Sequence, residues 1–131
     1  MAASRVVVLT IDKTGTLVPP DPGRAEPGQP VAFVMMNDHA SHDFRVEINF
    51  DNVTTKQDKT TKRNPFTKSG SRFHKLNPGE IDFIDQQVRP KTDFGTATLP
   101  FTTYKYTVQV TDVTANTPTV DYDPDWDVPP P

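Results

Sequence analysis

Prolines are spread along this chain so densely that long helices cannot form between them. There are 14 in 131 residues, and the segment 18–30 alone holds five. Proline lacks an amide donor and breaks both helices and central strands. The chain also has 18 threonines, whose branched side chains lower helix propensity. We therefore expect a single domain of β-strands joined by proline-rich connections, the longest of them at 18–30.

Two segments alternate apolar and polar residues, as a strand with one buried face does. In 42–50 the apolar face consists of Phe44, Val46, Ile48 and Phe50. In 103–112 it consists of Tyr104, Tyr106, Val108 and Val110. Further strands are expected at 5–12, 31–36, 81–88 and 94–99. The predicted fold is all-β, a single antiparallel Greek-key β-sandwich of about seven strands.

The expected core contains the inward-facing side chains of these strands. The predicted core residues are Phe33, Phe44, Val46, Ile48, Ile81, Phe83, Tyr106, Val108 and Val110. The run 31–36 is apolar throughout, which indicates a strand buried on both faces.

Charge divides the chain into a sandwich domain at 1–116 and a Pro/Asp-rich C-terminal tail at 117–131. Segment 56–75 carries seven basic residues and one aspartate, a net charge of +6. It lies in a polar stretch, 51–75, that we interpret as a basic insertion in the domain. Residues 112–131 carry five aspartates and no basic residue.

Three motifs together resemble the cupredoxin family. The segment 28–37 ends a buried strand in Asn37, five residues before His42, where that family has its first copper-ligating histidine. The turn 76–80 is similar to the Leu-x-Pro-Gly-Glu turn of the family, and 104–108 to its Tyr-x-Tyr-x-Cys strand. The chain departs from the pattern in the longer gap between Glu80 and Tyr104 and in the insertion at 51–75. The resemblance implies the cupredoxin-like sandwich topology.

The copper chemistry does not carry over from this resemblance. The chain has no cysteine, and Val108 stands where the family has its thiolate. A blue copper centre needs that thiolate, so we expect no copper site and no cofactor.

The sequence does allow another metal site, because His39 and His42 in H-x-x-H spacing, with Asp43, could hold a divalent ion. Polar side chains in a loop are the simpler interpretation of this cluster.

An enzyme is not expected. Ser41, His42 and Asp43 are adjacent in sequence, which rarely aligns a nucleophile, base and orienting group, and no nucleophile elbow is present.

The acidic segment 121–127 resembles the start of a calcium loop, but Trp126 occupies the position that needs glycine. The net charge of −3 argues against nucleic acid as a partner, and no apolar run is long enough to cross a membrane.

The favoured function is a non-catalytic structural or protein-interaction module in the cytoplasm, self-assembling as a homo-oligomer or docking into a larger complex. The alternative is a metal-binding or metal-handling module that uses His39 and His42. The interaction model brings the acidic tail of one molecule to the basic loop of another, with aromatic anchors. Its predicted interaction residues are Tyr122, Trp126, Asp121, Asp123, Asp125, Lys59, Lys62 and Arg63.

Overall fold

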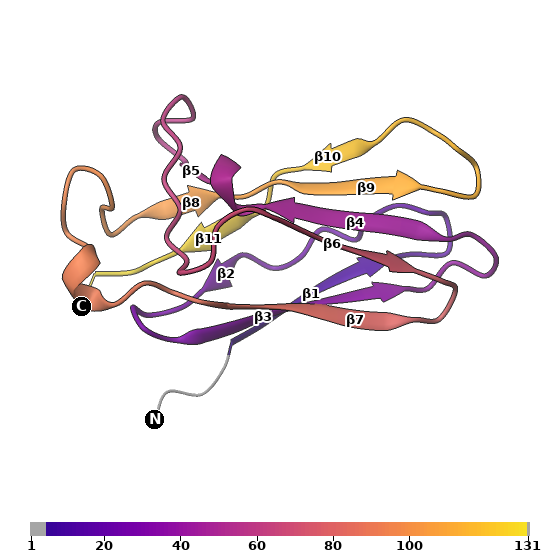
Figure 1. Cartoon of the computed structure of the whole chain (residues 1–131), viewed down its shortest axis with the longest axis horizontal. Helices are drawn as coiled ribbons and strands as arrows, with labels where there is room; N and C mark the ends of the chain where they lie inside the picture. The colour runs from indigo at the N-terminus through magenta and orange to yellow at the C-terminus, as the bar shows by residue number, and fades with distance from the viewer. Residues whose placement is uncertain (1–4, 131) are drawn as a thin grey trace.

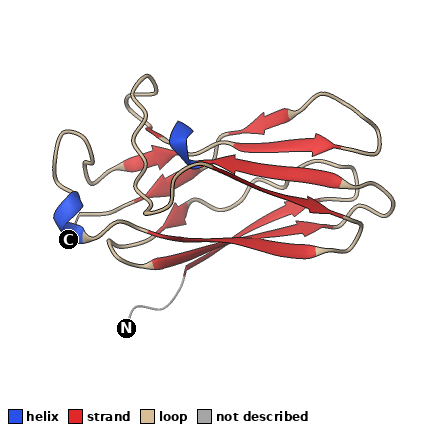
Figure 2. Ribbon diagram, viewed as in Figure 1, coloured by secondary structure: helices blue, strands red, loops and turns tan. Residues whose placement is uncertain are grey.

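The alternating segments form strands that pair in two facing layers (Figures 1 and 2). A computed structural model describes residues 5–130. One layer is a three-stranded sheet that contains, in order, β1 (Arg5–Ile11), β3 (Pro30–Asn37) and β7 (Ile81–Gln87). Strand β1 is parallel to β3, and β3 is antiparallel to β7.

The second layer consists of two four-stranded groups that lie end to end in Figure 1. The first group contains β10 (Val120–Tyr122), β9 (Val108–Asp112), β4 (Phe44–Asn49) and β6 (Ser71–Leu76). The second contains β2 (Gly23–Arg24), β11 (Asp125–Asp127), β8 (Thr103–Lys105) and β5 (Thr54–Thr55). The helices of the described chain are two single 3-10 turns, η1 (Phe50–Asn52) and η2 (Lys91–Asp93). Neither is long and apolar enough to span a membrane.

The predicted all-β sandwich is confirmed, but the expected number of strands is wrong. Residues 5–130 form eleven strands, and five of these have only two or three residues. Such short strands leave no alternation in the sequence for a pattern to detect. The strand expected at 94–99 is absent: this segment bends back on itself through a hydrogen bond from Gly95 N to Leu99 O, 3.0 Å long.

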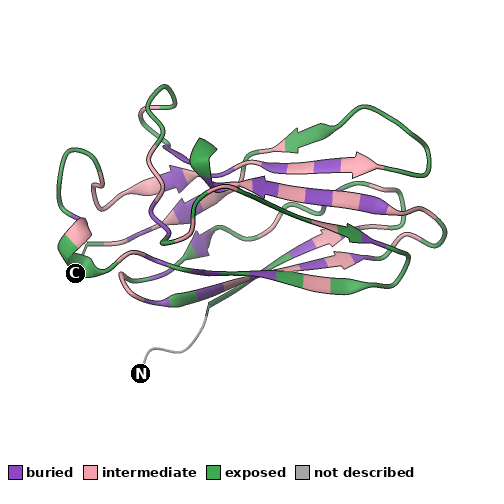
Figure 3. Cartoon of the chain, viewed as in Figure 1, coloured by how far each residue is buried: buried purple, intermediate pink, exposed green. Residues whose placement is uncertain are grey.

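Aromatic side chains fill the space between the layers. The Phe33 ring lies at the centre, with its centroid 5.4 Å from that of Tyr106 and 5.8 Å from those of Phe66 and Trp126. Figure 3 shows the resulting alternation of buried and partly exposed positions along β4 and β9. The expected core residues that are buried are Phe33, Phe44, Val46, Ile48, Tyr106, Val108 and Val110.

The expected inward orientation of Ile81 and Phe83 is wrong. Ile81 is 62% exposed and Phe83 is 56% exposed, whereas Ile84 and Val88 are buried. In the β3–β7 pair, Phe33 lies opposite Ile84, so even-numbered residues of β7 face the core. Because both faces of this strand carry apolar side chains, alternation in the sequence could not decide between the two orientations.

Both segments expected to lie outside the sandwich contribute to it. The basic insertion supplies β5 and β6, and its Val53 and Phe66 are completely buried. The expected tail at 117–131 supplies β10 and β11, which pair with β9 and β8. Sheet pairing and a few buried side chains therefore integrate two segments whose composition is mostly polar.

Two buried tyrosines predict a loss of stability in alkali. Burial raises the pKa of Tyr104 to about 12, and burial together with nearby Asp125 raises the pKa of Tyr106. The unfolded chain ionises near pH 10, so the folded state retains these protons over a range in which the unfolded state releases them. The free energy of unfolding should fall between about pH 10 and about pH 12. Urea denaturation at several pH values across this range measures the free energy of unfolding. Tyr104→Phe should reduce its fall with pH. An equal fall in the wild-type protein and the variant would contradict the assignment.

Candidate functional site

A buried amide fixes the loop that carries the two histidines. Asn37, at the end of β3, donates from Nδ2 to the carbonyl oxygens of His42, at 2.8 Å, and Leu76, at 3.0 Å. Its Oδ1 accepts from the backbone N–H of His39 at 3.0 Å. The loop thus places His39 and His42 side by side, as their spacing suggested.

The two imidazole rings stack and do not converge. Their centroids are 4.2 Å apart, with an angle of 29° between the ring planes. His39 Nδ1 accepts backbone hydrogen bonds from Ser41 N at 3.1 Å and His42 N at 3.0 Å. An imidazole binds a metal through a lone pair in the plane of its ring, so stacked rings do not direct two lone pairs at one ion.

Acidic neighbours do not complete a metal site in this loop. His42 Nδ1 lies 2.8 Å from Asp112 Oδ2, whereas Asp43 Oδ2 lies 3.8 Å from Lys75 Nζ. Burial opposes ionisation of Asp112, but hydrogen bonds from Ala115 N and His42 outweigh it and lower its pKa. Across residues 5–130 no three His, Cys, Asp or Glu side chains are grouped to hold a metal ion. The arrangement indicates a structural loop closed by a histidine–carboxylate contact.

The acidic strands at the C-terminal end pair with groups of their own chain. Asp125 contacts Lys56 Nζ at 3.2 Å and Lys105 Nζ at 2.5 Å. The hydrogen bond from Lys105 is the largest cause of its lowered pKa. Asp123 accepts from Thr107 Oγ1 at 2.9 Å, and Asp121 accepts from Gln109 Nε2 at 3.2 Å. Some of the acidic and basic residues that were predicted to join two molecules therefore form ion pairs within a single molecule.

The predicted aromatic anchors also turn inward. Trp126 has no exposed surface, so its assignment as a contact residue for another molecule is wrong. The Tyr122 hydroxyl accepts from Leu17 N at 3.3 Å and packs against the core. The alternation of aspartates with aromatic residues reflects a strand that docks on its own domain.

The basic residues predicted to contact a partner remain near the surface. Lys62 Nζ donates to Asn52 Oδ1 at 2.6 Å, and Arg63 lies 3.4 Å from Asp58. Lys59 is exposed, beside the shallow hollow that Lys105 and Asp123 also line. The structure places these groups on the side of β5 and β8, and their role in an interaction stays a prediction.

The sequence analysis missed an apolar surface on the outside of the three-stranded sheet. We call it the outer sheet face; its members are Val6, Val8, Ala32, Val34, Met36, Ile81 and Phe83. The strand registers place these seven side chains in adjacent rows. Val6 is 58% exposed and Val8 is 47% exposed. The continuous apolar run of β3 was the available signal, but it was interpreted as a strand covered on both sides.

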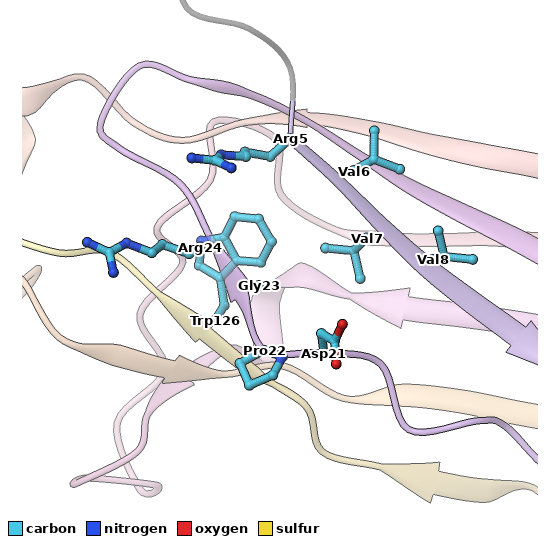
Figure 4. Close-up of a pocket in the computed structure, with 9 residues that line it drawn as sticks. All are labelled: Arg5, Val6, Val7, Val8, Asp21, Pro22, Gly23, Arg24 and Trp126. Carbon is cyan, nitrogen blue, oxygen red and sulfur yellow. The ribbon is translucent and has the colours of Figure 1, made fainter.

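A groove runs beside the outer edge of β1 (Figure 4). We call it the β1 edge groove; residues 5–8 form one side and residues 21–24 the other. Its volume is about 300 Å³. The indole of Trp126 lies between β2 and β1, and its Nε1 is buried without a hydrogen-bond partner among the described residues. No pattern in the sequence indicates this groove, because its two sides come together only when the chain folds.

Of the comparisons with known proteins, only the one with solved structures gives a match. No family model matches the chain, and no curated protein matches it. Among solved structures it is similar to reduced auracyanin from the photosynthetic bacterium Roseiflexus castenholzii, with a TM-score of 0.44 and 12% identity over 99% of this chain and 100% of the other. The β-sandwich that the cupredoxin resemblance implied is the fold that the strand pairing shows. Val108, at the position of the thiolate in that pattern, is a fully buried core residue.

Proposed function

We propose that the chain is a non-catalytic protein-interaction module that pairs with a second copy of itself through the outer sheet face. One observation carries the proposal: seven apolar side chains lie together on the outside of a sheet, and the charged residue beside them, Asp85 opposite Ala32, forms an ion pair with Lys68. Large contiguous apolar patches on a protein surface mark sites of association. The proposal places the module in the cytoplasm and assigns it no cofactor.

A second copy suits this surface better than a charged partner does. Two identical faces related by a twofold axis bring the same patch together, so each must complement itself. An apolar face whose neighbouring carboxylate, Asp85, is paired with Lys68 meets this condition. Sheets readily stack face to face, with their side chains interlocking across a layer about 10 Å thick.

The size of the face predicts weak association. Three strands about 4.8 Å apart and six residues long give roughly 14 by 20 Å, or on the order of 600 Å² for the two copies. Stable dimers bury about 1,200 Å² or more, so the pair should form and dissociate readily. We expect dimers to increase with concentration.

A matched pair of variants tests the proposal. Phe83 is exposed on β7, opposite Val34 of the central strand β3, and Val120 is exposed on β10 in the opposite layer. Phe83→Ser should lower the association constant at least about tenfold, because it removes an aromatic contact from each copy. Val120→Ser should leave the constant unchanged. Sedimentation velocity over a range of concentrations measures both.

Two outcomes would overturn this assignment. The wild-type protein would remain a monomer at the highest concentration, or Val120→Ser would weaken association as much as Phe83→Ser. Circular dichroism of each variant confirms that the sandwich is intact, because both side chains are exposed and their loss leaves the core complete.

A further inference from the structure

Half of the outer edge of β1 has no strand beside it. Near its C-terminal end this edge is covered, since Val18 N donates to Thr10 O at 2.8 Å. Backbone groups of alternate residues face the same edge of a strand, so the N–H and C=O of Val6 and Val8 face the same way as those of Thr10. Within residues 5–130 they have no backbone partner on that edge. An unpaired edge of this kind is a template for one more strand.

The opposite side of the β1 edge groove also offers a free peptide group. Ala25 N donates to Asp127 O at 3.2 Å, so the backbones of Gly23 and Ala25 face β11. Arg24 lies between them, and its N–H and C=O therefore face away from β11. In the described part of the chain they have no backbone partner. A strand lying in the groove would thus find backbone hydrogen-bonding groups on both sides, with the buried indole of Trp126 packed between them.

The charges around the groove favour an acidic occupant. Arg5 and Arg24 are exposed, and neither forms an ion pair with another described residue. Figure 4 shows both side chains pointing away from Asp21, toward the same end of the groove. Two unpaired guanidinium groups at one end attract carboxylates.

We propose that the β1 edge groove binds an extended peptide segment of a protein partner, with acidic side chains beside Arg5 and Arg24, that pairs with Val6 and Val8 as an added strand. This mode of recognition obtains affinity from main-chain hydrogen bonds and specificity from alternate side chains. A second copy paired through its own β1 edge is disfavoured, because it would bring its exposed Arg5 to the same arginine-rich groove. The inference goes beyond the proposed function, since it concerns the edge of the sheet and not its outer face.

Two model peptides test the chemistry of the occupant. One alternates valine and glutamate over about eight residues, longer than the free half of the β1 edge, and the other replaces each glutamate with lysine. The glutamate peptide should bind at least about tenfold more tightly, and its affinity should fall as salt is added. Fluorescence anisotropy of the labelled peptide measures affinity.

Variants locate the binding site. Arg24→Glu should weaken the glutamate peptide about tenfold, whereas Lys13→Glu, an equal charge change in the exposed turn after β1, should have little effect. Val6→Pro removes one donor from the free edge, where proline is tolerated, and should weaken binding by a similar factor. If Val6→Pro does not fold, the Arg24→Glu result decides.

Equal binding of the two peptides, or equal effects of Arg24→Glu and Lys13→Glu, would overturn the inference. The Phe83→Ser variant distinguishes a failure of this inference from a failure of the proposed function. This variant should weaken self-association at least about tenfold and leave peptide binding unchanged.

Discussion

Replacing Trp126 with alanine is expected to destabilise the domain by about 3–5 kcal/mol, the usual loss for a buried tryptophan. The side chain has no exposed surface, and its ring packs against Phe66, with centroids 5.3 Å apart, and against Phe33. It fills the space where β2 and β11 meet the sheet of β1, so its removal leaves a cavity that rigid strands cannot close. Urea denaturation followed by circular dichroism measures the loss.

A matched control separates this packing role from a surface role. Val120→Ala, on neighbouring β10, removes an exposed apolar side chain and should change stability by less than about 0.5 kcal/mol. A loss below about 1 kcal/mol for Trp126→Ala would contradict the buried position of the indole and restore it as a candidate contact residue.

A methyl group added at Gly23 is expected to destabilise the domain by about 3 kcal/mol or more, at or above the upper end for overpacking. A Cβ at this position would lie 2.0 Å from Trp126 Cε3, well inside van der Waals contact. Gly23 pairs directly with Trp126 between β2 and β11, so neither partner can move without disturbing the strands. Gly28→Ala is not a suitable control because Gly28 has a φ of +80°, which disfavours a side chain by itself.

The double variant identifies the clash as the cause. When Trp126→Ala is already present, Gly23→Ala should cost much less than it does alone, because the ring that it strikes is gone. A double-mutant cycle from urea denaturation should therefore show coupling of more than about 1 kcal/mol. Additive losses would mean that the cost at Gly23 comes from the backbone and not from the indole.

Side-chain periodicity predicted the strands that have one apolar face. Residues 44–50 and 104–110 alternate cleanly, and their inward side chains are buried as expected. Strand β7 has apolar residues on both faces, so the same rule gave the wrong orientation for Ile81 and Phe83. The direction of such a strand is set by its partner β3, and this information is not local in the sequence.

Amino-acid composition gave the wrong expectation for polar segments that strand pairing holds in the sandwich. The basic insertion and the acidic tail look like excursions because most of their side chains are polar. Yet Phe66, in the connection between β5 and β6, and Trp126, on β11, are fully buried, so a few apolar side chains are enough to join these segments to the sandwich. The sequence placed His39 and His42 in one loop because they are only three residues apart. The stacking of their rings depends on Asn37 and Asp112, which lie outside the H-x-x-H motif.

The most direct test of the central claim is a map of backbone amide shifts by NMR at increasing protein concentration. Self-association through the outer sheet face predicts that concentration-dependent shifts gather on β1, β3 and β7, with the largest around Val8, Val34 and Phe83. Amides of β9 and β10, in the opposite layer, should remain unchanged. Shifts gathered on β9 and β10, or none at any concentration, would contradict the account.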